Sequence, residues 1–273
     1  MLSFCILSSG SSGNVSVLQT DFACILIDCG CPAKYIIENL ADLKIKPTDL
    51  TAALITHAHS DHINASALNF LIKNKIPLYL HSSVLDDLYD RFEYKMDDCS
   101  IRTFDGAFKI ADIYIEAFRV YHKDGKISGA FGFALSNIVN DRKYKIGYVT
   151  DTGKICPLII NKLINSNILI IESNYDLEML KRSFRPQENK DWVSSDFGHL
   201  ANTDCVQAII NIKKLSKAED SLKYVFLSHI SFHHNTQSLA LETAGKKLKE
   251  YNINDINLFA ASRKMRSQII RID

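Results

Sequence analysis

Residues 56–62 read THAHSDH and hold a dense group of side chains that bind metals or transfer protons. The ligand candidates are three imidazoles and one carboxylate, namely His57, His59, Asp61 and His62. Burial of so many polar groups without a metal or a hydrogen-bond network would cost about 1 to 3 kcal/mol for each unsatisfied group. A lone histidine after a buried strand is usually structural, but this cluster favours a metal centre.

The segments that flank the cluster place it at a junction between two elements. Residues 50–55 are an apolar run typical of a buried strand, and residues 63–74 carry apolar side chains at helical spacing. The chain must turn sharply between these elements. The first two imidazoles can therefore point one way and the remaining carboxylate and imidazole another, as two neighbouring metal ions require.

Composition and charge restrict the possible classes of protein. A chain of 273 residues with 47% hydrophobic content can bury a sizeable core, and no Pro/Gly/Ser-rich linker divides it. We therefore expect residues 1–273 to form a single domain. Lys and Arg (32) nearly balance Asp and Glu (31), so the net charge gives no sign of a generally basic nucleic-acid binder. A polyanionic ligand would therefore have to be bound by a local group of basic residues.

Cysteine usage and the N-terminal segment indicate the compartment. The seven cysteines include no C-x-x-C pair and are typical of reduced thiols. The opening MLSFCILSSG has no basic region and only a short apolar run, so it predicts neither a signal peptide nor a membrane span. We expect a cytoplasmic protein with no membrane partner, and the oligomeric state stays open.

Strand and helix patterns recur along the chain. Strands are expected at residues 2–7, 15–19, 23–28, 50–55, 77–81, 113–121, 130–137, 144–150, 168–171, 224–227 and 257–261, the last of which closes the chain. Helices are expected at residues 33–43, 63–74, 177–182, 202–215 and 238–251. The Ser/Gly run at 8–14 lacks the lysine of a P-loop and predicts a tight loop between paired strands. This order predicts an α/β (α+β) fold with two packed sheets and helices outside.

Three further ligand candidates follow the ends of expected strands. They are His122, Asp151 and His229. Each has an ordinary alternative, because a strand-end Asp often caps a turn and a strand-end His often only bonds its neighbours. A dinuclear site that leaves room for water and substrate needs about six ligands. Because all three residues follow strand ends, as the 56–62 cluster does, we expect them to lie with that cluster at one edge of the fold.

The order His-X-His-X-Asp-His, followed by these three residues, resembles the metallo-β-lactamase fold hydrolases over nearly the whole chain. The resemblance implies a four-layer αββα sandwich, and Asp28 matches an early Asp that supports the family's site. It also implies two divalent metal ions. One would be held by His57, His59 and His122, the other by Asp61, His62 and His229, with Asp151 between them.

The resemblance also implies the chemistry of the site. A hydroxide that bridges two cations is a strong nucleophile near neutral pH, since the metals depress the pKa of bound water toward ~7. Asp61 would help to orient it. Histidine-rich ligation suits zinc, while manganese and iron also fit a mixed nitrogen and oxygen set.

Finer motifs resemble the YycJ (WalJ) group, which is related to RNase Z and PhnP phosphodiesterases. They are LSSGSSGN at the start, TDTG at 150–153, ESNYD at 172–176, SDFGHLAN at 195–202 and SHISFHHN at 228–235. Members of this group are regarded as DNA exonucleases, so the resemblance implies a nucleic-acid substrate, DNA in the first place. Related sequences often carry His where this chain has Tyr175, and a phenol would not titrate near neutrality.

The pairing of Glu172 with the Gly-His before residue 200 resembles the RNase Z arrangement, in which a His contacts the scissile phosphate. We expect His199 to act as phosphate contact or general acid. The helix expected from Asn202 also offers unpaired N–H groups that suit an anion. The alternative is that His199 only caps this helix.

Local cations are the candidate substrate contacts. They are Lys181, Arg182, Arg185 and Lys190, with Phe184 and Trp192 interleaved, and Asn174 in the ESNYD segment. Such a mixture suits backbone phosphates and stacked bases. The alternative is a solvated charged loop.

We therefore predict a metal-dependent phosphodiester hydrolase, specifically a DNA exonuclease that uses a hydroxide bridging two metal ions. Two alternatives stay open. One is the hydrolysis of a small ester, thioester or cyclic phosphodiester, since this scaffold serves all of them. The other is a non-catalytic metal or redox sensor. The full ligand set and His199 favour hydrolysis.

Overall fold

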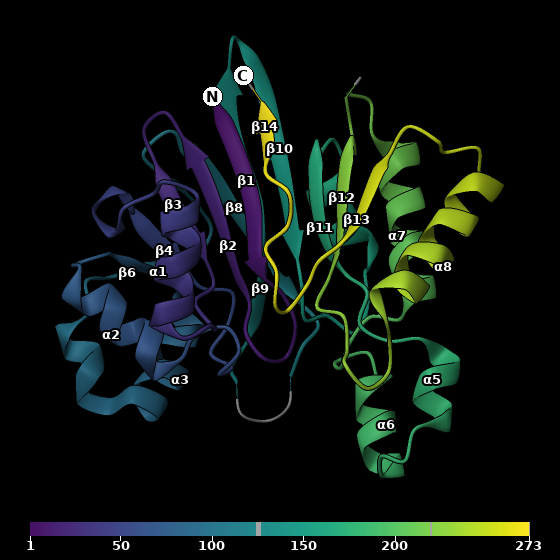
Figure 1. The fold of residues 1–273 in the computed structure, drawn as a ribbon, viewed down its shortest axis with the longest axis horizontal. Helices are drawn as coiled ribbons and strands as arrows, with labels where there is room; N and C mark the ends of the chain where they lie inside the picture. The colour runs from purple at the N-terminus through teal and green to yellow at the C-terminus, as the bar shows by residue number, and fades with distance from the viewer. Residues whose placement is uncertain (124–126, 219, 273) are drawn as a thin grey trace.

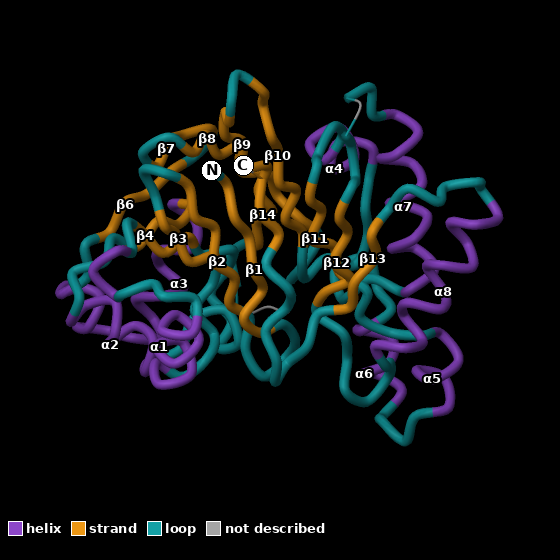
Figure 2. The backbone as a smooth tube through the Cα atoms, turned by 45° about the horizontal axis from the view of Figure 1, so that its top comes forward, coloured by secondary structure: helices purple, strands orange, loops and turns teal. Residues whose placement is uncertain are grey.

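The computed structural model describes residues 1–123, 127–218 and 220–272, and within them two seven-stranded mixed sheets pack face to face. Figure 1 shows the sheets side by side in the centre, with helices on both outer sides. Figure 2 shows the same arrangement from a second direction. The predicted four-layer αββα sandwich is confirmed.

The first sheet has the order β14-β1-β2-β3-β4-β5-β6. Its strands are β1 (Leu2–Ser8), β2 (Val15–Thr20), β3 (Cys24–Ile27), β4 (Ala52–Leu54), β5 (Leu78–His81), β6 (Ile101–Phe104) and β14 (Ile270–Ile272). Strands β14 to β3 pair antiparallel, and β3 to β6 pair parallel. The parallel pairing aligns the carboxyl ends of β3 and β4 at one edge.

The second sheet has the order β13-β12-β11-β10-β9-β8-β7. Its strands are β7 (Ala107–Ile110), β8 (Ile113–Val120), β9 (Ala130–Val139), β10 (Arg142–Val149), β11 (Ile168–Glu172), β12 (Tyr224–Ser228) and β13 (Asn257–Ala260). Strands β7 to β10 pair antiparallel, and β10 to β13 pair parallel. Each sheet thus has an antiparallel half and a parallel half.

Helices cover both outer faces of the sandwich (Figure 1). The first sheet carries α1 (Ala33–Asp42), α2 (Ala65–Lys73) and α3 (Ser82–Phe92), and the second carries α4 (Pro157–Leu163), α7 (Asn202–Leu215) and α8 (Gln237–Glu250). Two short helices, α5 (Leu177–Arg182) and α6 (Gln187–Val193), project from one end of the sandwich. We call residues 177–193 the α5–α6 arm. Two 3-10 turns, Pro47–Asp49 and Glu93–Asp98, complete the described elements.

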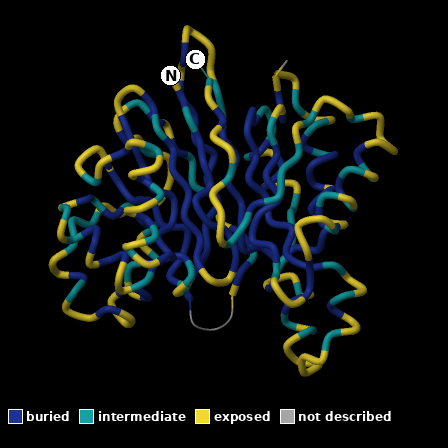
Figure 3. The backbone as a smooth tube through the Cα atoms, in the orientation of Figure 1, coloured by how far each residue is buried: buried dark blue, intermediate teal, exposed yellow. Residues whose placement is uncertain are grey.

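Apolar side chains from both sheets meet in the centre, where the strands are buried and the outer helices and loops are exposed (Figure 3). Phe4 of β1 and Phe226 of β12 are fully buried, and their ring centroids lie 6.2 Å apart at an interplanar angle of 59°. Tilted rings at this separation gain energy beyond the burial of area. This pair joins the two sheets directly.

Several elements were not predicted, namely α3, α4, α6, β6, β7 and β14. The prediction that the strand at 257–261 closes the chain is wrong, because β14 follows it and pairs antiparallel with β1, with Leu2 opposite Ile272. Strands of three or four residues are too short for their alternation to stand out. The seven cysteines are free, as predicted. Within the described residues, no helix has the length and apolarity needed to cross a membrane.

The contact between the sheets gives a stability prediction. Phe226→Ala should lower the free energy of unfolding by about 3 to 5 kcal/mol, because it removes a fully buried ring and leaves a cavity. Phe22→Ala is the matched control, since this ring is 75% exposed and its loss should change stability by no more than about 0.5 kcal/mol. Urea unfolding followed by circular dichroism measures both. Equal losses in the two variants would contradict the packing described.

Candidate metal centre

The predicted ligands lie together at one edge of the sandwich. The segment 56–62 follows β4, His122 follows β8, Asp151 follows β10, and His229 follows β12. Three of the residues that follow strands here have positive φ angles, with 59° at Asp28, 53° at Asp151 and 51° at His229. Such backbone is uncommon for residues other than glycine and concentrates at functional sites. Here it turns side chains from neighbouring strands toward one point.

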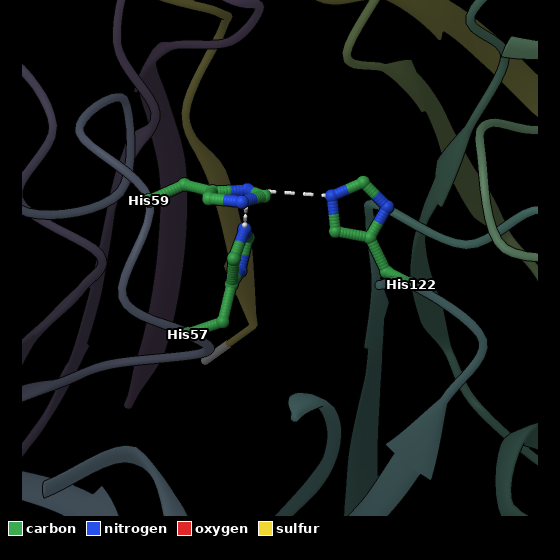
Figure 4. Close-up of side chains that lie close together, drawn as sticks. All are labelled: His57, His59 and His122. Atoms are coloured by element: carbon green, nitrogen blue, oxygen red, sulfur yellow. Dashed lines mark hydrogen bonds between the residues drawn. The ribbon is translucent and has the colours of Figure 1, made fainter. Parts of the chain in front are cut away.

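His57, His59 and His122 form the first group (Figure 4). Nδ1 of His59 lies 2.9 Å from Nε2 of His57 and 3.3 Å from Nε2 of His122. In His57 and in His122, the contact made by the other ring nitrogen, Nδ1, fixes the tautomer of the ring. Nδ1 of His122 donates to the Gly198 carbonyl at 3.0 Å, and Nδ1 of His57 contacts the Thr56 hydroxyl at 3.0 Å.

Thr56 links His57 to the buried carboxylate of Asp28. Its hydroxyl donates to Asp28, with Oγ1 2.9 and 3.0 Å from the two carboxylate oxygens, so it accepts the proton of His57 Nδ1. Both His57 and His122 then present bare Nε2 lone pairs to Nδ1 of His59, which can supply only one proton. A cation among the three nitrogens satisfies all of them, so this donor set fits a metal ion.

Asp61, His62 and His229 form a second group beside Asp151. Nδ1 of His62 lies 2.7 Å from Oδ2 of Asp28, and its Nε2 lies 3.0 Å from Oδ2 of Asp151. That carboxylate oxygen is buried and makes no hydrogen bond of acceptable geometry with any residue that the structure describes. Nε2 of His229 lies 3.4 Å from Asp61 and 3.5 Å from Asp151. A second cation here would satisfy the orphaned oxygen.

Charges within this group shift the pKa of several members. Burial acts to lower the pKa of His62, but the carboxylates of Asp28, Asp151 and Asp61 hold it well above its usual range. Burial also opposes ionisation of Asp151, yet the imidazoles of His229 and His62 hold the pKa of its carboxyl well below its usual range. Burial and the charge of His62 lower the pKa of His57. Without a metal ion, His62 therefore carries a proton on both ring nitrogens, and a bound cation would take the place of the proton on Nε2.

Glu172 joins the second group to His199. Its Oε1 lies 2.7 Å from Nδ1 of His199 and 3.1 Å from Nδ1 of His229, and its Oε2 accepts the backbone N–H of Thr152 at 2.7 Å. Glu172 is fully buried, and although burial raises the pKa of its carboxyl, the neighbouring His199 lowers it below the usual value. The alternative that His199 caps α7 is wrong, because Ala201 occupies the cap position without a side-chain bond.

The α5–α6 arm reaches this centre through Trp192. Its ring makes an edge contact with His199 at 5.3 Å and lies 5.9 Å from His122. Trp192 also packs on a small apolar cluster of Tyr175, Leu180, Val193 and Ala201 that is separate from the main core. Trp192 was expected to stack on bases, but the structure places it against the candidate ligands.

The other candidate substrate contacts lie in two places, on the exposed surface of α5 and against the candidate ligand His229. Lys181 and Arg182 are exposed on α5 and face Glu178, with nitrogen–oxygen distances of 3.0 and 3.8 Å. Asn174 is buried, and its amide donates to the His229 carbonyl at 2.8 Å. Burial raises the pKa of Tyr175 to about 12, in line with the expectation that it does not titrate near neutrality. The substrate contacts of Lys181, Arg182, Arg185 and Asn174 stay predictions.

Backbone contacts hold the 56–62 segment rigid. Asn14 donates its N–H to the Asp61 carbonyl at 2.7 Å, and its side-chain nitrogen lies 3.0 Å from Nε2 of His62. A Cβ at Gly30 would overlap the Asp61 carbonyl, so only glycine allows this close approach. Arg91 of α3 donates to the carbonyls of Ala58 and Ile63. Sequence reasoning missed these supports. Only the Asn in SSGN, next to glycine, gave a local signal.

Comparisons with known proteins agree with this geometry. The family model described as the beta-lactamase superfamily domain matches residues 24–230. The chain belongs to the beta-lactamase superfamily. The chain is 31% identical over 253 residues to a Streptococcus pneumoniae protein named exodeoxyribonuclease WalJ, with 92% of this chain and 89% of that protein covered. It is 28% identical over 258 residues to exodeoxyribonuclease YycJ of Bacillus anthracis, with 91% and 90% covered.

Solved structures of this superfamily confirm the fold. The metallo-β-lactamase fold protein YhfI of Bacillus subtilis superposes with a TM-score of 0.70 at 14% identity, covering 98% of this chain and 100% of that one. The resemblance to the YycJ/WalJ group and the αββα fold, both predicted from the motifs, are therefore confirmed. The chain is a hydrolase of the beta-lactamase superfamily, with a cluster suited to divalent metal binding.

The supporting role of Thr56 can be tested directly. Thr56→Val keeps the side-chain shape but removes the hydroxyl between Asp28 and His57, so metal affinity should fall about 10- to 100-fold. Zinc titration of the metal-free protein against a competing chelator measures the affinity. Thr103→Val, an exposed position on β6, is the matched control and should bind zinc as the wild type does. Unchanged affinity in Thr56→Val would show that its hydroxyl does not orient the ligands.

Proposed function

We propose that this hydrolase is a metal-dependent phosphodiesterase that removes nucleotides from DNA ends. One observation carries the proposal, namely that two groups of candidate ligands lie around Asp151, with His199 beside them and bonded to the buried Glu172. The two relatives named exodeoxyribonucleases, matched over about nine tenths of this chain, support the choice of DNA.

The ligand assignment follows the geometry. His57, His59 and His122 would hold one divalent ion, and Asp61, His62 and His229 the other, with Asp151 shared between them. Such ions, when bound, supply a hydroxide nucleophile near neutral pH and neutralise charge on the phosphate. Zinc suits the imidazole-rich set, and manganese or iron would also fit.

Asp61 is the best placed carboxylate to orient the attacking water. Its side chain is 18% exposed, whereas that of Asp151 is 3% exposed and that of Asp28 is fully buried. The carboxylate of Asp61 is therefore reachable from solvent while it stays 3.4 Å from Nε2 of His229. By accepting a hydrogen bond from the attacking water, Asp61 would direct the lone pair of the water oxygen toward the phosphorus.

His199 is placed to protonate the leaving oxygen. Its Nδ1 is bonded to the buried Glu172 at 2.7 Å, which fixes the orientation of the ring. The opposite ring nitrogen, Nε2, would then carry the proton given to the departing 3′ or 5′ oxygen. Glu172 also contacts His229, so the same carboxylate positions the acid and one ligand.

The metal dependence gives the first test of this function. Chelator treatment should abolish cleavage of end-labelled duplex and single-stranded DNA, and added zinc or manganese should restore it. Asp151→Asn should lower kcat/KM by about 10²- to 10³-fold, because it removes the charge shared by both ligand groups. Asp141→Asn is the matched control, since this exposed residue in the β9–β10 turn also has a positive φ. Full activity of Asp151→Asn would overturn the metal mechanism.

The role of His199 gives a second test. His199→Gln should lower the kcat for DNA by about 10²- to 10⁴-fold, the range of general acid catalysis. The same variant should cleave bis(p-nitrophenyl) phosphate almost as fast as the wild type, because p-nitrophenolate leaves without protonation. Metal content should stay unchanged, which distinguishes an acid from a ligand. Hydrolysis of the small diester without any degradation of DNA by the wild type would contradict the nuclease assignment.

A further inference from the structure

A pocket of about 520 Å³ lies between the α5–α6 arm and the loop that follows β12. Arg182, Arg185, Phe184, Met179, His233 and His234 line it, together with Ser183 and Glu178. None of its lining residues belongs to the two ligand groups described above. The pocket is thus a separate site on the same molecule.

His234, one of the lining residues, carries an unpaired polar atom. The residue is only 5% exposed, and its Nε2 is buried without a hydrogen-bond partner among the residues that the structure describes. A buried polar atom left in this way costs about 1 to 3 kcal/mol, so such atoms usually have a ligand or water. Burial and the positive charges of His233, Arg185 and Lys190 lower the pKa of His234. A neutral imidazole in a positive field can donate an N–H to an anion.

The charges around the pocket favour a phosphate. Arg185 makes no ion pair or hydrogen bond with any described residue, and Arg182 is only loosely paired with Glu178, at 3.8 Å. Glu178 is the one acidic lining residue, and its charge is already opposed by Lys181 at 3.0 Å. Guanidinium groups recognise phosphate oxygens through paired N–H bonds.

The position of Phe184 favours a nucleic acid as the source of this phosphate. Its side chain is fully exposed and stands between the two arginines in sequence, at the rim of the pocket. An exposed aromatic ring beside cations is the pattern by which proteins hold single strands, with the base stacked on the ring and the backbone on the cations. A free phosphate or a phosphopeptide would make no use of it.

Hydrogen bonds that involve the backbone also connect the pocket with the metal centre. The carbonyl of His234 accepts the N–H of Asp176 at 2.8 Å, and Asn174 bonds the backbone of His229 and Ser231 at 2.8 and 2.9 Å. Segment 229–236 therefore contributes residues to both sites, and segment 172–176 is bonded to it. If a nucleic-acid strand binds with its scissile phosphate at the metal centre, these links would keep the pocket at a fixed distance from that phosphate.

We propose that this pocket binds a non-scissile phosphate of the nucleic-acid substrate, terminal or internal, with the adjacent base stacked on Phe184. The inference rests on the proposed nuclease function and adds the subsite that would grip the strand. Arg185 and His234 would contact the phosphate, and Arg182 would add charge at its edge.

Binding of a cleavage-resistant substrate tests the proposal apart from catalysis. A fluorescent phosphorothioate ten-nucleotide strand should bind Arg185→Ala about 10-fold more weakly than the metal-loaded wild type by anisotropy. The slope of log affinity against log salt should fall by about 0.7, the value for one phosphate contact on a single strand. Binding of a dinucleotide and hydrolysis of bis(p-nitrophenyl) phosphate should be unchanged, because neither ligand reaches the pocket.

Matched variants complete the test. Arg142→Ala removes an exposed arginine at the start of β10 that does not line the pocket, and this variant should bind as the wild type does. Phe184→Ala should weaken binding without changing the salt slope, and His234→Gln should weaken it if the variant keeps its melting temperature. Strands with a 5′-phosphate and with a 5′-hydroxyl distinguish a terminal phosphate from an internal one.

The outcomes separate the two proposals. Wild-type affinity and salt slope in Arg185→Ala would overturn the phosphate subsite, even if the wild type degrades DNA. Conversely, Arg185-dependent binding in a protein that cleaves no DNA would overturn the nuclease function and keep the subsite as a nucleic-acid contact.

Discussion

The buried carboxylate of Asp28 fixes the orientation of both ligand groups. One oxygen lies 2.7 Å from Nδ1 of His62, and the Thr56 hydroxyl carries the constraint to His57. Asp28 is completely buried, and although burial raises the pKa of its carboxyl, the contacts with His62 and Thr56 oppose that rise. Because the tautomers of His57 and His62 follow from this one group, the direction of their lone pairs does as well.

The strand order explains how Asp28 reaches both histidines. β3 and β4 pair in parallel with Ile27 opposite Leu54, so the residues that follow each strand emerge side by side. In the second sheet β10, β11 and β12 also pair in parallel, which sets Asp151, Glu172 and His229 along the same edge. Parallel strands carry their functional groups at their carboxyl ends, and packing the two sheets face to face joins both edges into one centre.

The sequence predicted the ligands better than the framework that orients them. His57, His59, Asp61 and His62 were recognisable because their density has no ordinary structural explanation, and His122, Asp151 and His229 because each follows an apolar run. Thr56 and Arg91 were missed, because a threonine at a strand end or an arginine on a helix is common and only the fold shows what it contacts. Short strands such as β14 were missed because their pairing partner is distant in sequence.

The α5–α6 arm shows why the predicted charged segment could not be interpreted from its composition. Its last turn places Trp192 against His199 and His122, while Arg185 and Phe184 in its middle line the pocket. A small apolar cluster around Tyr175 and Val193 anchors the arm independently of the main core. The arm therefore contributes side chains both to the surroundings of His199 and to the pocket. With a net charge of only +1, the protein has no strong overall field to attract a polyanion, so local groups such as Arg185 would have to supply that attraction.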